Sequence, residues 1–478
     1  MTGAKRAAEH VHLIGIGGTG MTSLAGLLQA SGCRVTGSDG ALYPPTSDIL
    51  RALRLEIHAG FDPARLEPAP DLVVIGNAVS RGNPEVEAVL DRDLTYASMP
   101  AVIAGRFLRG RHSIVVAGTH GKTTTASMLA WTLARAGREP GFLIGGQPRN
   151  FDLPFRLGGG AAFVIEGDEY DTAFFDKGPK FMHYRPRTAV LGAVEFDHAD
   201  IYADLGQVKA AFRRFVNLVP SRGLVVRNDD CDAAREVTSG ALARVEGFAL
   251  GAAPWRAEIT SEDPSGVAFR ILRHGEPFAA VRLRVGGAHN VLNALAAVAA
   301  AVEQGLGAAE IAAGLESFDG VRRRLETRGC EDGVIVLDDF AHHPTAIEAT
   351  LRAVRARHPA SRVWAVCEPR SWSLRRNVFQ DELAGALAEA DEVVVAAVFA
   401  ADRIQPAERL DPERLVADLR RRGRGARFVP EPDAIVALLA GEARAGDVVT
   451  VMSNGGFGGL HERLLQALAA RAVAPRRV

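Results

Sequence analysis

The sequence predicts an α/β protein with three domains: a Rossmann-like N-terminal domain, a P-loop central domain that carries an antiparallel meander, and a Rossmann-like C-terminal domain. The 478 residues leave room for about three domains, and the apolar fraction of 47% suits a globular protein. An apolar strand followed by a glycine turn and a helix occurs near residue 15 and again near residue 118. The last third alternates apolar strands with helical stretches, which is typical of a parallel sheet. We expect the domains to span 1–110, 111–320 and 321–478.

Composition and charge exclude several classes of protein. The formal net charge of −1 argues against a surface that binds nucleic acid. No run of about 18 apolar residues occurs, so no membrane span is expected, and the first ten residues lack the apolar core of a secretory signal. The four cysteines are too far apart for a metal or redox pair, which fits a reducing cytoplasm: Cys33, Cys231, Cys330 and Cys367. We expect a cytoplasmic protein that is a monomer or a weak dimer.

The first glycine turn predicts a nucleotide-binding βαβ unit. It follows a strand over 11–16, precedes a helix over 21–30, and is followed by a strand over 33–37 that ends at Ser38 and Asp39. The turn and the helix N-terminus can hold a pyrophosphate through Gly15, Gly17, Gly18 and Gly20. NAD is the usual ligand of such a turn, so a nicotinamide-dependent oxidoreductase is one alternative. A second nucleotide site downstream, and the Pro-Pro pair that interrupts the next helix, favour another nucleotide such as a UDP-sugar.

A further strand over 71–76 places Asn77 and Ser80 at its carboxyl end. Open α/β sheets bind ligands at this edge, so both residues are candidates for the same nucleotide. Ordinary turn and helix-cap roles are an equal alternative for them.

The second glycine turn predicts a triphosphate site at the centre of the chain. The apolar run 114–117 reads as a buried strand, and the turn that follows is Gly118, Thr119, His120, Gly121, Lys122, Thr123 and Thr124. Its glycines let backbone N–H groups approach an anion, Lys122 supplies charge for the terminal phosphates, and the Thr123 hydroxyl suits Mg²⁺. Val116 stands where the longer P-loop pattern has glycine, so a strand, turn and helix without a ligand is the alternative.

Acidic strings follow two further strands of the central domain. A glycine- and proline-rich loop is expected over 141–160, then a strand over 161–166, and another over 188–194 that precedes Glu195 to Asp200. Mg²⁺ takes oxygen ligands, and Glu166 and His198 are our candidates at this sheet edge. Solvated loop acids and a surface histidine are the alternative. Asp168, Glu169 and Asp171 are expected farther from the ion or at the surface.

Two later regions carry further candidates. The segment 255–285 alternates apolar and polar residues with turns near 264 and 274, which predicts an antiparallel meander. His289, Asn290 and Asn293 then share one helical turn and could contact a purine, or simply form an N-cap cluster.

In the last domain, three strands end in polar or glycine-rich turns at 338–345, 368–371 and 453–459. Adjacent His342 and His343 favour substrate contact or a helix N-terminal role over a metal site.

The order of these motifs resembles the Mur ligase family of ATP-dependent, amide-forming enzymes of cell-wall synthesis. The resemblance rests on Gly118 to Thr124, the Glu166 string, Glu195-x-Asp-His198, His289-Asn-x-x-Asn293, Arg322-Arg-Arg324 and Asp338-Asp-x-x-His-His-Pro344. Within the family the sequence is most similar to the murein peptide ligase branch, through Gly37-Ser-Asp39, Phe175-Asp-Lys177, Glu368-Pro-Arg-Ser371 and Met452 to Gly459. It departs from the family pattern at Gly167 and Ala193, and from the branch pattern at Trp372, Leu374, Asn377 and Phe379.

The resemblance implies a reaction: UDP-N-acetylmuramate would be joined to the recycled tripeptide L-alanyl-γ-D-glutamyl-meso-diaminopimelate while ATP becomes ADP. The alternative is the sister reaction, in which L-alanine takes the place of the tripeptide.

The resemblance also implies roles for single residues. Lys122 and Arg324 would contact the phosphates, Asp339 the ribose, and His289, Asn290 and Asn293 the adenine. Thr123 and Glu166 would bind one Mg²⁺ and His198 a second. The glycine turn, with Ser38, Asp39, Asn77 and Ser80, would hold the UDP-sugar. The muramoyl group or the peptide would face His342, Arg370, Ser371 and Asn454.

Overall fold

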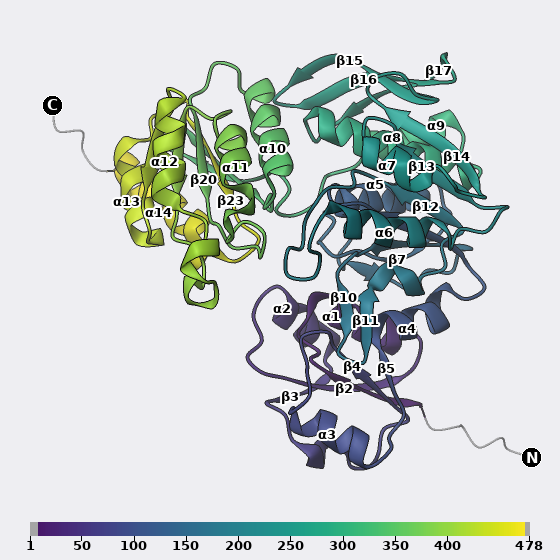
Figure 1. Ribbon diagram of the computed structural model, residues 1–478. Coiled ribbons are helices and arrows are strands. Elements are labelled where there is room, and N and C mark those ends of the chain that lie inside the picture. Colours follow the sequence, from purple (N-terminus) through teal and green to yellow (C-terminus); the bar gives the residue numbers. More distant parts are fainter. Residues whose placement is uncertain (1–7, 474–478) are drawn as a thin grey trace, which may run out of the picture. The chain divides into compact units, whose positions relative to one another are not determined.

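The computed structural model describes residues 8–473, which fold into two compact units (Figure 1). Unit 1 contains the chain up to residue 195 together with 205–255 and 293–314, and unit 2 contains 196–204, 256–292 and the chain from residue 315. The expectation about a secretory signal falls mainly on residues 1–7, which lie outside the described residues.

The N-terminal part of unit 1 is a five-stranded parallel sheet in the order β3-β2-β1-β4-β5. This is the Rossmann order, and the strand order reverses between β1 and β4. Its strands are β1 (His10–Ile14), β2 (Arg34–Asp39), β3 (Glu56–Ala59), β4 (Leu72–Ile75) and β5 (Tyr96–Ser98), and its helices are α1 (Thr19–Ala30), α2 (Thr46–Leu53), α3 (Pro84–Asp91) and α4 (Met99–Ile103). The apolar residues of β1 and β4 are almost completely buried, which is why these two strands form the middle of the sheet.

The P-loop lies on the second sheet of unit 1, whose strand order is β14-β13-β12-β6-β9-β7-β8. All neighbours in this part are parallel except β7 and β8. The strands are β6 (His112–Ala117), β7 (Gly141–Leu143), β8 (Phe155–Arg156), β9 (Ala162–Gly167), β12 (Thr188–Leu191), β13 (Leu224–Asn228) and β14 (Arg244–Ala249). The helices are α5 (Lys122–Arg135), α6 (Leu205–Val216) and α7 (Asp232–Thr238), with most of α8 (Ala288–Glu303) and α9 (Ala308–Glu316).

The expectation of a loop over the whole of 141–160 is wrong. Strands β7 and β8 form within it, and Phe142 and Phe155 are buried. Phe142 also contacts the ring of Phe151 at 4.5 Å between centroids. Aromatic burial gives this glycine-rich segment a fixed place at the edge of the sheet.

A hairpin links the P-loop sheet to the N-terminal sheet within unit 1. It consists of β10 (Asp171–Ala173) and β11 (Asp176–Pro179), and it directly follows the acidic string that begins at Glu166. Ser98 donates a hydrogen bond to Asp176 at 2.5 Å, and the rings of Tyr96 and Phe175 meet edge to face at 4.9 Å. The acidic string is therefore held at both ends, by β9 and by this docked hairpin.

Unit 2 contains the predicted meander and a six-stranded sheet. The meander is β15 (Trp255–Asp263, of which Trp255 belongs to unit 1), β16 (Gly266–Arg273) and β17 (Glu276–Leu283). The sheet has the order β18-β19-β23-β20-β21-β22 and is parallel except for β18. Its strands are β18 (Glu326–Glu331), β19 (Val334–Asp339), β20 (Val363–Cys367), β21 (Glu392–Val395), β22 (Gly425–Phe428) and β23 (Val448–Met452).

Helices cover both faces of this sheet (Figure 1). One buried cluster joins the sheet to α10 (Pro344–Arg357), α11 (Gln380–Leu387) and α12 (Pro412–Arg421). A second cluster joins it to α13 (Pro432–Glu442) and α14 (Leu460–Val473). The sequence alone did not predict β18, an edge strand of mostly exposed residues, or β22, an edge strand of only four residues.

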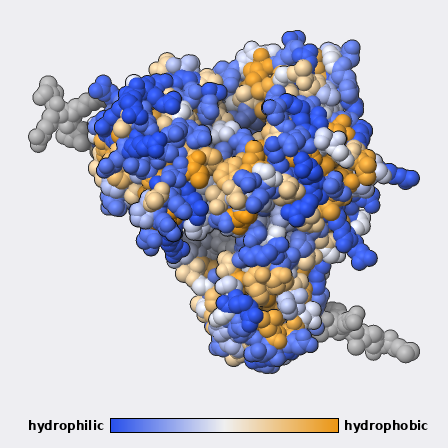
Figure 2. Space-filling model, in the orientation of Figure 1, coloured by the Kyte–Doolittle hydropathy of each residue, from blue (hydrophilic) through white to orange (hydrophobic). Residues whose placement is uncertain are grey.

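Among the described residues, no helix is both long enough and apolar enough to cross a bilayer. On the face drawn in Figure 2, apolar side chains occur in small patches between hydrophilic ones.

Candidate functional site

The glycine turn after β6 has the conformation that a phosphate cradle needs. Gly118 and Gly121 both have positive φ, and α5 begins at Lys122 directly after Gly121. An added Cβ at Gly118 would lie 2.9 Å from the backbone nitrogen of Gly192 and 3.0 Å from the carbonyl oxygen of Ala193. Glycine is therefore required at this position both by backbone conformation and by the close approach of the neighbouring chain.

Lys122 is held by a buried carboxylate. Its Nζ lies 2.8 Å and 3.0 Å from the two oxygens of Glu169 and donates to the carbonyl of Gly118 at 2.6 Å. Glu169 is only 2% exposed. Burial favours the neutral amine, but the carboxylates of Glu169, Asp168 and Glu166 outweigh it, so the pKa of Lys122 is raised and the side chain is charged at pH 7. Of the two places expected for Glu169, the surface is wrong because the side chain is buried; it contacts Lys122 rather than the predicted ion ligand Thr123.

Thr123 and Glu166 are adjacent at the carboxyl ends of neighbouring strands. The Thr123 hydroxyl donates to one oxygen of Glu166 at 3.1 Å, and the backbone N–H of Gly145 donates to the other at 2.6 Å. Strand β9 pairs with β6 in parallel, which brings the end of β9 beside the start of α5. The predicted pair of oxygen ligands is therefore assembled within unit 1.

Asn293 contacts the P-loop itself. An added Cβ at Gly121 would lie 2.3 Å from its side-chain oxygen, and that oxygen accepts a hydrogen bond from Thr125 at 3.2 Å. The structure thus places Asn293 in unit 1 against the turn, while His289 and Asn290 at the start of the same helix belong to unit 2.

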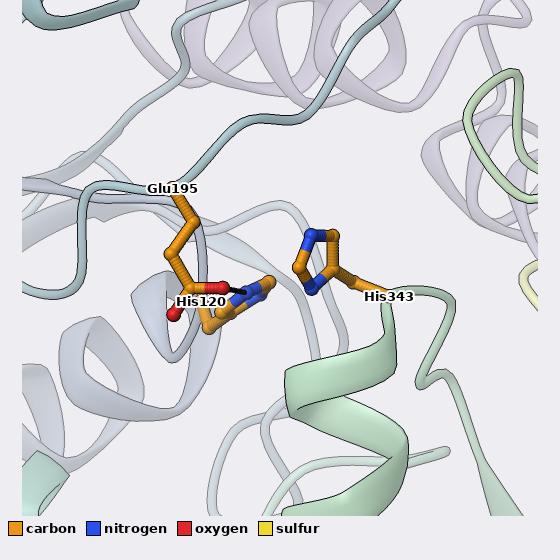
Figure 3. Close-up of side chains that lie close together, drawn as sticks. All are labelled: His120, Glu195 and His343. Carbon is orange, nitrogen blue, oxygen red and sulfur yellow. Dashed lines mark hydrogen bonds and ion pairs between the residues drawn. The ribbon is translucent and has the colours of Figure 1, made fainter. Parts of the chain in front are cut away.

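The segment after β12 is fastened to the turn as well. Thr119 donates its N–H to the carbonyl of Ala193 at 2.7 Å, and its hydroxyl accepts the N–H of Glu195 at 2.9 Å. Figure 3 shows the ion pair between His120 and Glu195, at 3.3 Å. Strand β12 ends at Leu191 rather than at the expected 194, because the chain turns there to make these contacts.

The N-terminal glycine turn is closed by its own acid. Asp39 accepts the N–H of Gly17 at 2.7 Å through one oxygen and the N–H of Gly40 through the other. Asn77 and Ser80 are exposed in the turn after β4. The turn, Asp39 and these two residues all lie at the carboxyl ends of β1, β2 and β4, where the sequence predicts the UDP-sugar.

Ser38 lies elsewhere, in a fully buried polar cluster. Its hydroxyl donates to Glu85, and Glu85 also faces the imidazole of His12 at 3.6 Å. Burial raises the pKa of Glu85, but hydrogen bonds from His12, Ser38 and the backbone of Asp62 outweigh it and the pKa is lowered. Ser38 therefore fixes α3 to the sheet in this structure.

Three of the residues predicted to contact ATP belong to unit 2: His289, Arg324 and Asp339. Burial, helped by Arg324, lowers the pKa of His289 to about 4, so its ring is neutral at pH 7. Arg324 lies over the ring of Phe340 at 5.0 Å. Asp339 accepts backbone N–H groups of Leu325 and Ala341 at 2.7 Å each, so in this structure both its oxygens hold the chain.

The two adjacent histidines have different surroundings. The ring of His343 accepts the N–H of Thr345 and caps α10, which confirms the helix N-terminal role for this residue (side chain drawn in Figure 3). The Nδ1 of His342 lies 3.0 Å from the carbonyl of Phe340. His342 also lies 3.9 Å from Asp197, whose pKa is lowered because the charges of nearby histidines and the Ser373 hydroxyl outweigh its burial.

Three family models match the chain, one for each predicted domain. They are the Mur ligase family catalytic domain over 10–109, the Mur ligase middle domain over 116–301, and the Mur ligase glutamate ligase domain over 323–455. The chain belongs to the Mur ligase family.

Two relatives that match this Mur ligase over nearly their whole length have different names. The sequence is 43% identical to UDP-N-acetylmuramate–L-alanyl-γ-D-glutamyl-meso-2,6-diaminoheptandioate ligase of Escherichia coli K12, over 97% of this chain and 99% of the relative. It is 39% identical to UDP-N-acetylmuramate–L-alanine ligase of Kineococcus radiotolerans, over 96% of each chain.

Two of the similar solved structures carry corresponding names. The murein peptide ligase of Psychrobacter arcticus has a TM-score of 0.72 at 38% identity, and UDP-N-acetylmuramate–alanine ligase of Thermotoga maritima has a TM-score of 0.79 at 25% identity. Each comparison covers 97% of this chain and 99% of the other.

The family and the α/β fold class predicted from the sequence are confirmed, and a nicotinamide-dependent oxidoreductase does not fit a Mur ligase. Of the candidate residues, the structure brings together the turn Gly118 to Thr124, Glu166 and Asn293 in unit 1. His198, His289, Asn290, Arg324, Asp339, His342, Arg370, Ser371 and Asn454 belong to unit 2. The sequence analysis named Glu169 and Glu195 but did not predict their contacts with Lys122 and His120; the only signal for these contacts was the repeated acids after each strand.

Proposed function

We propose that this Mur ligase joins UDP-N-acetylmuramate to L-alanyl-γ-D-glutamyl-meso-diaminopimelate, with conversion of ATP to ADP and phosphate. The observation that carries the proposal is the 43% identity, over 97% of the chain, to the Escherichia coli ligase of that name. The domain limits 1–110, 111–320 and 321–478, the cytoplasmic location and the monomeric or weakly dimeric state remain predictions.

The chemistry begins on the lactyl carboxylate of the muramoyl group. One of its oxygens attacks the γ-phosphorus of ATP, the bond to the β-γ bridging oxygen breaks, and ADP leaves an acyl phosphate behind. The alanyl amine then adds to the acyl carbon, loses a proton, and expels phosphate to form the amide. Charge accumulates on phosphate oxygens in the first step, and charged Lys122, with a predicted contribution from Arg324, would neutralise it.

The pair of Thr123 and Glu166 fits a magnesium ion. Two neighbouring ligands of octahedral Mg²⁺, each at about 2.1 Å, lie about 3 Å apart. The hydroxyl of Thr123 and the carboxylate oxygen of Glu166 are 3.1 Å apart, and the N–H of Gly145 fixes the carboxylate. We expect these two residues to hold the ion, which would supply positive charge to the phosphates, and we expect His198 to hold a second.

Phosphate release tests the proposal. Purified protein is given UDP-N-acetylmuramate, ATP and Mg²⁺, and then the tripeptide, L-alanine or no amine. We expect release and a new UDP-linked product with the tripeptide. Absence of tripeptide-dependent release would contradict a ligase of this specificity, whether or not L-alanine is active.

A second candidate, the L-alanine ligase reaction, is favoured by a specific observation. The structure of the Thermotoga maritima alanine ligase matches with a TM-score of 0.79 across 97% of the chain. This candidate predicts that free L-alanine, but not the tripeptide, supports product formation in the same assay.

A further inference from the structure

Two neighbouring strands of the N-terminal sheet carry buried polar side chains. These are His12 on β1 and Thr36 and Ser38 on β2, and each is at most 4% exposed. Strands in the middle of a parallel sheet are ordinarily apolar on both faces. Burying polar groups is costly unless hydrogen bonds compensate for the lost water, so the partners of these side chains indicate what they do.

Glu85, in the first turn of α3, joins these side chains into one network. It is completely buried. One of its oxygens accepts the Ser38 hydroxyl and lies 3.6 Å from Nε2 of His12, and the other accepts the N–H of Asp62 at 3.0 Å. Nδ1 of His12 lies 2.8 Å from the Thr36 hydroxyl. The carboxylate is therefore the acceptor at the centre of a buried hydrogen-bond network.

The backbone of Ser38 holds the N-terminal glycine turn. Its carbonyl oxygen accepts the N–H of Gly15 at 2.8 Å and that of Ile16 at 3.2 Å. The next residue, Asp39, accepts the N–H of Gly17 at 2.7 Å. Two consecutive residues of β2 thus fix three N–H groups of the turn, and the turn sets the place of the α1 N-terminus, where a pyrophosphate would bind.

The two ends of Ser38 therefore connect α3 to the turn. Its hydroxyl is bound to the carboxylate of Glu85, and its carbonyl is bound to the turn. Hydrogen bonds to an ionised acceptor are roughly twice as strong as neutral ones, and the pKa of Glu85 is lowered despite its burial. Loss of the carboxylate would release the end of β2 that holds the turn.

Packing of α3 does not require a carboxylate at position 85. Val86 and Val89 of the same helix are completely buried in an apolar cluster with Ile14 and Val73, so apolar contacts already fasten α3 to the sheet. Buried ionic groups can often be replaced by apolar residues without loss of stability. The polar network is therefore better explained by what Ser38 holds than by the attachment of the helix.

We propose that Glu85 is a positioning residue for the sugar nucleotide: through Ser38 it keeps the glycine turn, and with it the α1 N-terminus, in the conformation that receives the pyrophosphate. The inference rests on the proposed function, which supplies the UDP-sugar as substrate. Ser38, predicted from the sequence as a ligand contact, then acts on the ligand only through the turn.

Ligand titration and hydrogen exchange test this role together. Wild type, Glu85→Ala and Ser38→Ala are titrated with a non-hydrolysable ATP analogue and Mg²⁺, and then with UDP-N-acetylmuramate in the presence of that analogue. Exchange of the amides over 15–18 is followed by mass spectrometry without ligand. We expect each variant to bind UDP-N-acetylmuramate about tenfold more weakly, as the loss of one hydrogen bond to a charged group implies. Affinity for the ATP analogue should stay within twofold, and the amides should exchange faster.

Val89→Ala is the matched control for a merely structural effect. It removes methyl groups from a completely buried position of the same helix, outside the polar network. This variant should melt at a lower temperature than wild type but keep the wild-type affinity and exchange. Glu85→Gln retains an acceptor oxygen and should fall between wild type and Glu85→Ala, which keeps the role measurable if the alanine variant does not fold.

The outcomes separate this inference from the proposed function. Wild-type affinity and exchange in Glu85→Ala or Ser38→Ala, or an equal loss of affinity in Val89→Ala, would overturn the positioning role. Failure of wild type to bind UDP-N-acetylmuramate would instead contradict the proposed function. In that case the exchange of the turn amides, which needs no ligand, decides by itself whether Glu85 positions the turn.

Discussion

Replacement of Gly118 by alanine should damage the P-loop through its backbone rather than through loss of any functional group. The φ of Gly118 is +126°, a region that alanine rarely adopts. An added Cβ would also lie 2.9–3.0 Å from the backbone of Gly192 and Ala193. Backbone atoms cannot rotate away as a side chain can, so the turn and the segment after β12 must separate.

The size of the effect follows from these contacts. A strained φ costs about 1–3 kcal/mol, and loss of the Thr119 to Ala193 hydrogen bond adds about 1 kcal/mol, so the free energy of unfolding should fall by about 2–4 kcal/mol. Relief of the contact needs a shift of about half an ångström, and the carbonyl of Gly118 would carry Lys122 with it. A misplacement of 1 Å can cost about hundredfold in rate, so we expect kcat to fall about tenfold or more.

Gly137→Ala is the matched control. Gly137 also has positive φ, at +71°, but no atom lies within 4 Å of its added Cβ. This variant should lose about 1–2 kcal/mol of stability and keep its kcat. Urea unfolding and phosphate release at saturating substrates measure both quantities. A Gly118→Ala protein with the stability and kcat of Gly137→Ala would refute the steric argument.

Three further predictions concern the charged contacts. Lys122→Ala should abolish phosphate release and lower the free energy of unfolding by about 3 kcal/mol because Glu169 stays buried; adding Glu169→Gln should recover stability in urea but not activity. Glu85→Gln should melt at a lower temperature than wild type at pH 7. The pKa of Glu85 is lowered in the folded protein, so the carboxylate stabilises the fold only while it is ionised, and the difference in melting temperature should shrink as the pH falls below about 4.5. A difference at pH 4 that equals the one at pH 7 would contradict this. Asp39→Ala should raise KM for the UDP-sugar by freeing Gly17 and leave KM for ATP within twofold, as substrate-dependent kinetics would reveal.

Local patterns were sufficient for most of the fold. Apolar runs such as 114–117 and glycine turns such as 15–20 identify strands and the helices after them, and both occur where predicted. Strands β7 and β8 were missed because their burial depends on partners elsewhere in the chain, such as β9. An edge strand of mostly exposed, polar residues, such as β18, offers no apolar run that could predict it.

For the candidate site too, local motifs could be predicted from the sequence and long-range contacts could not. Lys122 and Thr123 follow from one contiguous motif, and Glu166 follows from its place at a strand end. The Asp39 contact with Gly17 and the burial of Ser38 depend on how β1, β2 and α3 meet, which spacing does not reveal. Residues that support a site from a distance are therefore harder to predict than those within its motifs.

Glu166 and Glu169 illustrate why the acidic string has two separate roles. Consecutive residues of α5, Lys122 and Thr123, face different carboxylates that lie three positions apart. Glu166 is still within β9 and is fixed by the register of that strand against β6, whereas Glu169 lies beyond its end, between β9 and the docked hairpin. Because the hairpin also contacts Tyr96 and Ser98, the carboxylate that holds Lys122 is positioned by both sheets of unit 1. The charge state of the P-loop lysine thus depends on an element that the N-terminal sheet anchors.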